Sequence, residues 1–335
     1  DKLKSKEYDF LRTDKNLGNN IIILTLGGSH AYGTNNEGSD LDIRGCALNS
    51  KMQILTNENF EQFVNNETDT TIYAFNKLVA LLSNTNPNTI EMLGNKPEHY
   101  FYVSPIGQEL IDNAHLFLSK RACHSFGGYA NQQLYRLNQK AAHQMSQSEL
   151  EKHILKTLEF MQTDFTKKYT PYKDDSMKLY IDKAVQEGYD TEIFMDVNLH
   201  HYPLRDYCSM WNELQNTVRQ YGKIGKRNEK AIEHGKIAKH SMHLIRLYMM
   251  CLDILEKKRI ITYREDEHDL LMDIRNGKYL DGNDQPIPEF FEMVNDYEKR
   301  LDYAKKNTNL PDNPNYKAIN EFVASVNERV VKGEI

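Results

Sequence analysis

The stretch LGGSHAYGTNNEGSDLD, residues 26–42, decides the fold of this chain. It follows the β-branched apolar run of residues 21–26, which is too short for a buried helix and predicts a buried strand. Residues 41–48 alternate between apolar and polar side chains and predict a second strand. We expect a glycine-rich turn between them, in which no helix begins. Because residues i and i+2 of a strand point to the same side, Asp40 and Asp42 would present two carboxylates to one space.

This pattern of carboxylates and glycines favours the chemistry of metal ions and phosphates. Two close carboxylates repel each other unless a cation neutralises them, and Mg²⁺, or Mn²⁺ in its place, prefers oxygen ligands. Glycines at 27 and 28 let the backbone approach a phosphate, to which Ser29 offers a hydroxyl and an N–H. Either half of the motif alone is compatible with an ordinary turn. The stretch is neither a Walker loop nor a dinucleotide fingerprint, because it lacks their residue spacing and the helix they require.

The rest of the chain predicts an α+β fold. Residues 69–75 predict a third strand, which continues into a helix over 76–83, and Asn86-Pro87 separates that helix from a short one over 89–93. From about residue 119 the strand signals fade. Helical spacing of apolar residues then predicts helices over 125–144, 149–165, 207–221, 230–257, 289–306 and 315–332. We therefore expect a domain with a small mixed sheet at 1–115 and a mostly helical domain at 116–335.

Composition excludes several classes of protein. The 335 residues are 39% hydrophobic and 27% charged, which fits a globular chain and excludes collagen-like and disordered ones. No apolar run approaches 18 residues, so we expect no membrane span and no membrane partner. The four cysteines are widely spaced and form no CxxC pair, and we find no secretory signal. Together these features predict a cytoplasmic protein.

Charge is distributed unevenly along the chain. Residues 1–115 carry nine Lys and Arg against 15 Asp and Glu, whereas residues 116–335 carry 33 of each sign. Eight basic residues against two acidic ones fall within 219–246. An acidic part beside a basic segment suits a polyanionic partner held through metal ions and cations, although a solvated helix face also explains a run of charge.

Four blocks, in order, resemble a known family. Gly28-Ser29 is followed ten residues later by Ser39-Asp40-Leu41-Asp42, which resembles the signature of the DNA polymerase beta nucleotidyltransferase superfamily. Further blocks at 69–93, 126–133 and 239–247 resemble the bacterial and phage nucleotidyltransferases associated with RNA repair operons. The resemblance covers about residues 22–276.

The resemblance implies a minimal nucleotidyltransferase domain, a small mixed sheet flanked by helices, followed by a helical domain. It implies transfer of a nucleoside monophosphate from an NTP to an acceptor hydroxyl, with release of pyrophosphate. Asp40 and Asp42 would ligate two metal ions, and a third carboxylate on a neighbouring strand would bind the metal that activates the acceptor. We assign that role to Asp69 because it opens the next predicted strand, with Glu67 and Glu91 as alternatives.

The resemblance also implies a set of nucleotide-binding residues, which are Gly27, Gly28, Ser29, Ser39, Lys239, His243 and Arg246. The last three stand at positions i, i+4 and i+7 and share one face of the expected helix. Lysine, histidine and arginine on one face suit a triphosphate. A surface helix whose histidines are satisfied locally is the alternative interpretation.

The acceptor is less defined than the donor. An RNA or tRNA 3′ end fits the basic segment and the resemblance. A protein hydroxyl, as in toxin–antitoxin nucleotidyltransferases, or a small molecule is the alternative. A non-catalytic nucleotide-binding protein with the same fold is a third possibility, which the intact Ser29, Asp40 and Asp42 disfavour.

Overall fold

A computed structural model describes residues 2–130, 137, 147–169, 171–173, 175–185, 191–232, 236–282 and 286–335. The chain divides into two compact units. The first unit comprises Asp1–Gln133, Ser241–Tyr279 and Ile287–Ile335, and the second comprises Leu134–His240 and Leu280–Pro286. The expected boundary between residues 115 and 116 falls inside the first unit, which also contains the C-terminal helices. The division into a catalytic and a helical domain stays a prediction.

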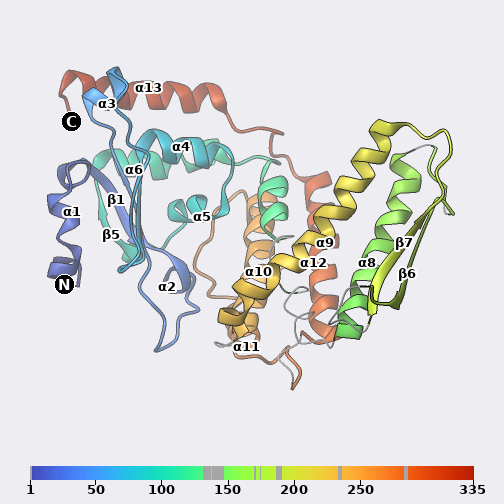
Figure 1. The fold of residues 1–335 in the computed structure, drawn as a ribbon. Helices are drawn as coiled ribbons and strands as arrows, with labels where there is room; N and C mark the ends of the chain where they lie inside the picture. Colours follow the sequence, from blue (N-terminus) through green and yellow to red (C-terminus); the bar gives the residue numbers. More distant parts are fainter. Residues whose placement is uncertain are drawn as a thin grey trace. The chain divides into compact units, whose positions relative to one another are not determined.

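The first unit is built on a five-stranded mixed sheet (Figure 1). Its strands are β1 (Ile21–Leu26), β2 (Ile43–Ala47), β3 (Gln62–Asn65), β4 (Thr70–Ala74) and β5 (Tyr100–Val103). The spatial order is β3-β4-β2-β1-β5. Only β2 and β4 pair in parallel, with Ile43 opposite Thr70, and the other neighbours are antiparallel. The start of β2, the start of β4 and the end of β1 therefore lie together. They form one edge of the sheet in the sense of the side that runs across the strand ends.

Each face of this sheet is covered by its own apolar cluster. One cluster packs Ile43 and Ile72 against Tyr8 and Leu11 of the N-terminal segment. The other cluster, which contains Ile23, brings together apolar residues of β1 and of the helices α4, α6, α10, α12 and α13. Because β1 is buried on both faces, its apolar run is nearly continuous.

The helices of the first unit come from both ends of the chain. They are α1 (Phe10–Thr13), α2 (Gly28–Tyr32), α3 (Lys51–Leu55), α4 (Phe75–Ser83), α5 (Pro87–Ile90), α6 (Pro105–Asp112), α10 (Lys236–Leu252), α11 (His268–Arg275), α12 (Pro288–Asn307) and α13 (Tyr316–Lys332). A π-helical turn, Asp253–Lys257, continues α10, whose residues 236–240 count with the second unit. None of the described helices is long and apolar enough to cross a membrane.

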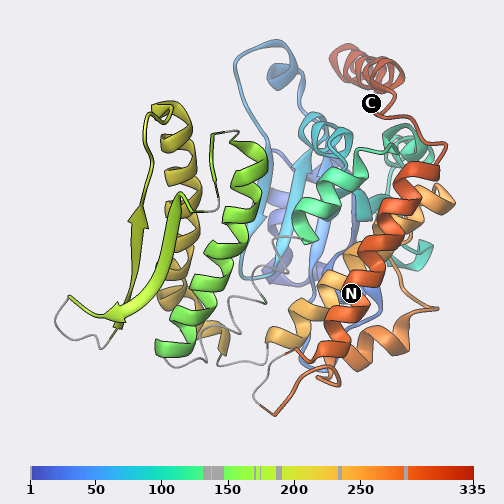
Figure 2. The ribbon, with the colours of Figure 1, turned by 90° about the vertical axis from the view of Figure 1, so that its right-hand side faces the viewer.

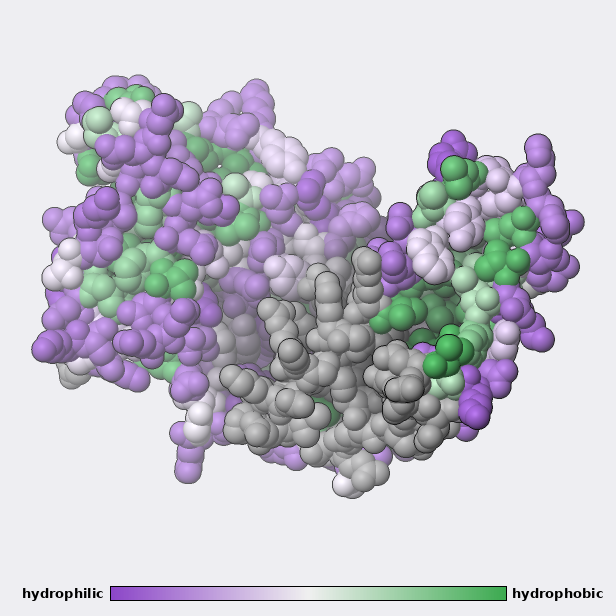
Figure 3. Space-filling model, viewed as in Figure 1, coloured by the Kyte–Doolittle hydropathy of each residue, from purple (hydrophilic) through white to green (hydrophobic). Residues whose placement is uncertain are grey.

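The second unit pairs two helices with a β-hairpin (Figure 2). Helices α8 (Gln147–Lys168) and α9 (Leu204–Ile232) and strands β6 (Met177–Lys183) and β7 (Thr191–Val197) share a small apolar core around Phe165 and Met210. Part of the apolar surface stays exposed in a groove of about 460 Å³ that Trp211 helps to line (Figure 3). The side chains of residues 219–236, most of the basic segment, lie outside the described residues.

The structure confirms the α+β class and three predicted strands, and it corrects several details. Strand β2 begins at Ile43, so Asp40 and Asp42 precede it. The expectation of a turn without a helix is wrong, because α2 begins at Gly28. Strands β3 and β5 were not expected, and neither were β6 and β7 in the part expected to be helical. All four have exposed or half-buried side chains at most positions and so carry little apolar alternation. Of the predicted helix 125–144, only residues 125–130 and 137 are described.

Candidate active site

The loop after β1 brings Asp42 against a glycine. Gly27 adopts an extended conformation and caps α2, and Gly28 has a φ of +58°, a region that favours glycine. A Cβ atom on Gly28 would lie 1.8 Å from Oδ2 of Asp42. The Gly27 N–H donates to the Asp42 carbonyl at 2.9 Å. The glycine pair is therefore required by both the backbone and the carboxylate beside it.

Arg44 joins Asp42 to the neighbouring strand. Its guanidinium donates to Oδ1 of Asp42 at 3.2 Å and to the main-chain oxygen of Asp69 at 2.8 Å. The Ile43 N–H donates to the same Asp69 oxygen at 3.1 Å. Because β2 and β4 are parallel and Ile43 lies opposite Thr70, Asp69 sits beside Asp42 at the edge of the sheet. The structure thus brings together the two aspartates that the sequence separates by 27 positions.

The donor set here consists of oxygen atoms, which suits Mg²⁺ or Mn²⁺. Asp40 is exposed and Asp42 is partly exposed, so both carboxylates are accessible to a cation. Within the described ranges, no three His, Cys, Asp or Glu side chains lie close enough to hold a metal ion together. Asp69 is exposed and has a φ of +45°. The chemistry of the donor set fits such a cation, and the roles of Asp40, Asp42 and Asp69 as its ligands stay predictions.

The two alternative carboxylates occupy different surroundings. Glu67 is exposed in the turn before β4, where its N–H donates to the Asn65 side chain at 2.9 Å. Glu91 is only 5% exposed, and the Tyr32 hydroxyl donates to its two oxygens at 2.9 and 3.0 Å. The Glu91 carboxylate is therefore enclosed among protein groups.

Arg246 lies in the same buried cluster. It is 1% exposed, its guanidinium contacts Glu91 at 3.3 Å, and its Cζ lies 3.5 Å from the centre of the Tyr32 ring. Burial raises the pKa of Glu91, and Arg246 opposes that rise. Burial also raises the pKa of Tyr32, so its hydroxyl remains a donor. The Glu91–Arg246 ion pair holds Tyr32, at the end of α2, against α10. A contact of Arg246 with a triphosphate stays a prediction.

The other two members of the predicted cationic face differ from Arg246 in exposure. His243 is half-buried, and its Nδ1 lies 3.3 Å from the Arg246 guanidinium. Lys239 is exposed and belongs to the second unit. All three residues lie on α10, but Arg246 contacts Glu91 and the Tyr32 ring and is buried there.

The serines of the loop take separate positions. Ser29 is buried in α2, and its carbonyl accepts the Thr34 N–H at 2.9 Å. Ser39 accepts a hydrogen bond from Arg275 of α11 at 3.1 Å and donates to Asn36 at 2.8 Å.

Arg275 is a cation beside the loop that sequence analysis missed. Its second terminal nitrogen, Nη1, is buried and has no hydrogen-bond partner among the described residues, and burial lowers its pKa. An arginine on an amphipathic helix gives no local signal of such a contact, because Ser39 lies 236 residues away. Sequence analysis also missed Arg44, because its pattern is that of an ordinary outward-facing residue of a strand.

The five-stranded mixed sheet with its flanking helices is consistent with a nucleotidyltransferase domain of the DNA polymerase beta class. A family model described as RNA repair pathway DNA polymerase beta family matches residues 4–325. The chain belongs to that family, as its four sequence blocks predicted. A search of curated proteins and a search of solved structures found no match.

Proposed function

We propose that this protein transfers a nucleoside monophosphate from an NTP to a hydroxyl at an RNA 3′ end, with Mg²⁺ or Mn²⁺ held by Asp40 and Asp42. The position of Asp42 against Gly28, at the sheet edge shared with Asp69, carries the proposal. A carboxylate in close contact with the glycine pair supports a metal and phosphate site at this loop. The family supplies the link to RNA repair.

The reaction would use this edge as follows. The oxygen of the acceptor hydroxyl attacks the α-phosphorus of the NTP, and the bond from that phosphorus to the α–β bridging oxygen breaks. Pyrophosphate leaves with the bridging oxygen. The bound cations, when present, stabilise negative charge on the reacting phosphate oxygens. Asp69, exposed beside Asp42, would orient the acceptor hydroxyl and accept its proton.

The remaining residues would orient the nucleotide. Ser29 and the glycine pair approach its phosphates through the backbone. Arg275, with one unpartnered nitrogen beside Ser39, would stabilise the negative charge of the leaving pyrophosphate. Arg246 acts through Glu91 and Tyr32, because these contacts hold the C-terminal end of α2 in place.

A label-transfer assay tests this proposal. Each α-labelled NTP is incubated with Mg²⁺, the full chain and total cellular RNA, using wild type, Asp42→Asn and Glu37→Gln. Glu37→Gln removes an exposed carboxylate of the same loop and is the matched control. We expect labelled RNA with wild type and the control, and loss of transfer by at least about 100-fold in Asp42→Asn. Label on protein would contradict the RNA acceptor. NTP binding without pyrophosphate release would contradict the transfer reaction itself.

A further inference from the structure

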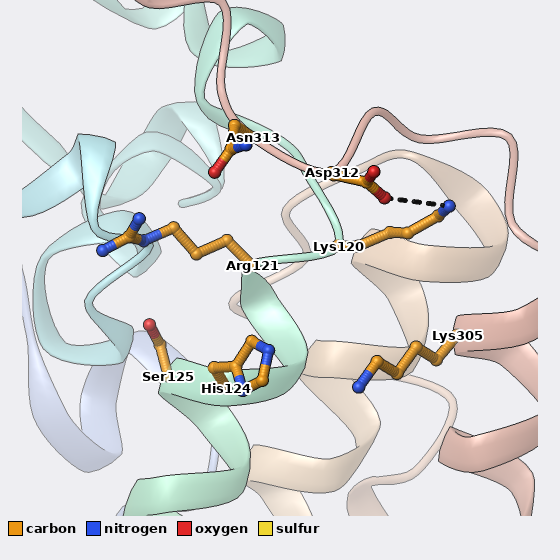
Figure 4. Close-up of a pocket in the computed structure, with 7 residues that line it drawn as sticks. All are labelled: Lys120, Arg121, His124, Ser125, Lys305, Asp312 and Asn313. Atoms are coloured by element: carbon orange, nitrogen blue, oxygen red, sulfur yellow. Dashed lines mark ion pairs between the residues drawn. The ribbon is translucent and has the colours of Figure 1, made fainter.

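A second concentration of positive charge lies in the first unit, in a cavity of about 580 Å³ (Figure 4). We call it the Lys305 pocket. It forms where the N-terminal end of the helix that starts at residue 122, the C-terminal part of α12 and the connection from α12 to α13 meet. Its lining residues are Lys120, Arg121, His124, Ser125, Lys305, Asp312 and Asn313. None of them belongs to the candidate active site.

The walls of the pocket are fixed by hydrogen bonds. Arg121 donates to the side chain of Asn84 at 2.8 Å and to the hydroxyl of Tyr316 at 3.4 Å. Ser125 donates to the main-chain oxygen of Asn84 at 2.6 Å. These contacts use only two of the five N–H donors that a guanidinium carries. Arg121 is therefore held in place with donors to spare.

The charge of the pocket is not balanced by the protein. Asp312, the one carboxylate among the lining residues that the structure describes, pairs with Lys120 at 3.1 Å. Neither Arg121 nor Lys305 forms an ion pair with any residue in the described part of the chain. In Figure 4 the Lys305 amine points toward the His124 ring across the cavity. Spare donors on two unpaired cations call for a ligand with several anionic oxygens, which is the chemistry of a phosphate group.

The lining favours a phosphate of an RNA backbone over a free nucleotide. Its described residues include no Phe, Tyr or Trp on which a base would stack, so recognition would rest on the phosphate. We propose that the Lys305 pocket binds a backbone phosphate of single-stranded RNA, as a contact separate from the active site. The choice of RNA rests on the proposed function, whereas the affinity of the pocket for phosphate does not.

Fluorescence anisotropy with labelled single-stranded RNA tests the pocket directly. Lys305→Glu reverses a pocket charge, and Lys306→Glu makes the same change at the next position, which is exposed and does not line the pocket. We expect Lys305→Glu to weaken binding about tenfold and to lower the slope of log K against log salt by about 0.7. Lys306→Glu should change affinity less than about threefold. Equal losses in the two variants would overturn the proposal in favour of a diffuse basic surface.

Competition separates the two sources of phosphate. Unlabelled RNA should displace the probe at a lower phosphate concentration than AMP or inorganic pyrophosphate, because a strand contacts the protein through several phosphates at once. Displacement by AMP at a phosphate concentration no higher than that of RNA, lost in Lys305→Glu, would assign the pocket to a nucleotide and overturn the choice of RNA.

The rate of alkylation of Cys123 reports ligand binding at the Lys305 pocket. This cysteine is half-buried between Ala122 and His124, and its pKa is lowered by a hydrogen bond with Cys251 and by the charge of Lys305. A phosphate bound to Lys305 should cancel part of that charge, so RNA should slow alkylation of Cys123 by iodoacetamide, measured by peptide mass spectrometry. Protection that persists in Lys305→Glu would contradict the assignment.

Failure of the Lys305 pocket proposal can be distinguished from failure of the proposed transfer reaction. Asp42→Asn should abolish transfer and leave RNA affinity unchanged. Lys305→Glu should raise the RNA concentration that transfer requires and leave turnover at saturating RNA unchanged. Loss of turnover at saturating RNA in Lys305→Glu would place the pocket in the reaction and overturn its separate role.

Discussion

Replacing Arg246 with methionine should destabilise the first unit by about 3–5 kcal/mol, because it leaves the Glu91 carboxylate buried without its cation. The pair is almost fully enclosed, with side chains 1% and 6% exposed, so water cannot replace the lost contact. Methionine keeps much of the arginine volume and limits the cavity that the change creates. The Tyr32 hydroxyl still donates to Glu91 but carries no charge.

The double variant Arg246→Met/Glu91→Gln separates charge from packing. With both charges removed, the buried site holds neutral groups, and Tyr32 can still donate to the amide oxygen at position 91. We expect the double variant to lie within about 1 kcal/mol of wild type, so removing Glu91 should recover most of the stability lost in Arg246→Met. Additive losses would refute the electrostatic account.

The stability loss in Arg246→Met should depend on pH in a definite direction, which provides an independent check. Burial raises the pKa of Glu91, so the ionised form costs stability at pH values above the pKa of the unfolded chain. Removing Arg246 raises that pKa further. The deficit of Arg246→Met should therefore shrink as the pH falls toward about 4.3, the ordinary value for glutamate, and the double variant should show no such change. Hydrogen exchange of peptides from β1 and β2 measures this, and a deficit that does not vary with pH would contradict the reasoning.

Two further substitutions test the edge of the sheet. Gly28→Ala should reduce transfer by at least about 100-fold and destabilise the loop by about 1–3 kcal/mol, since its Cβ would overlap the Asp42 carboxylate at a φ of +58°. Steady-state kinetics and thermal unfolding measure the two effects, and full activity would refute the close approach. Arg275→Gln should lower kcat/KM for NTP by about tenfold while RNA affinity stays constant, whereas the same change at the exposed Arg205 of the second unit should leave kcat/KM unaltered. Equal effects of the two would remove Arg275 from the site.

Local sequence patterns predicted the parts of the fold that depend on local interactions. The apolar run of residues 21–26 predicts β1 because a fully buried strand needs an apolar side chain at nearly every position. The two aspartates are recognisable for a similar reason, because the glycines that admit Asp42 lie in the same stretch. Strands β3 and β5 lie at the edges of the sheet, where one face is open, and their side chains follow no such rule.

Contacts between distant segments could not be predicted. The sequence shows that Arg246 shares a helix face with His243, but only the contacts of Arg246 with Glu91 and Tyr32 show that this arginine is buried. Arg275 reaches Ser39 across 236 positions, so neither residue marks the other. These long-range pairs decide which cations remain available to a ligand.

The separation of Glu91 from Arg246 has a consequence for synthesis of the chain. The two residues stand 155 positions apart, and the main part of the second unit, Leu134–His240, is translated between them. At about 5–20 residues per second, the ribosome needs roughly 8–30 s to supply the arginine after it has made the glutamate. Throughout that interval, closing Tyr32 over Glu91 would bury an uncompensated charge. The loop that carries Ser29 should therefore stay open until α10 has emerged from the ribosome.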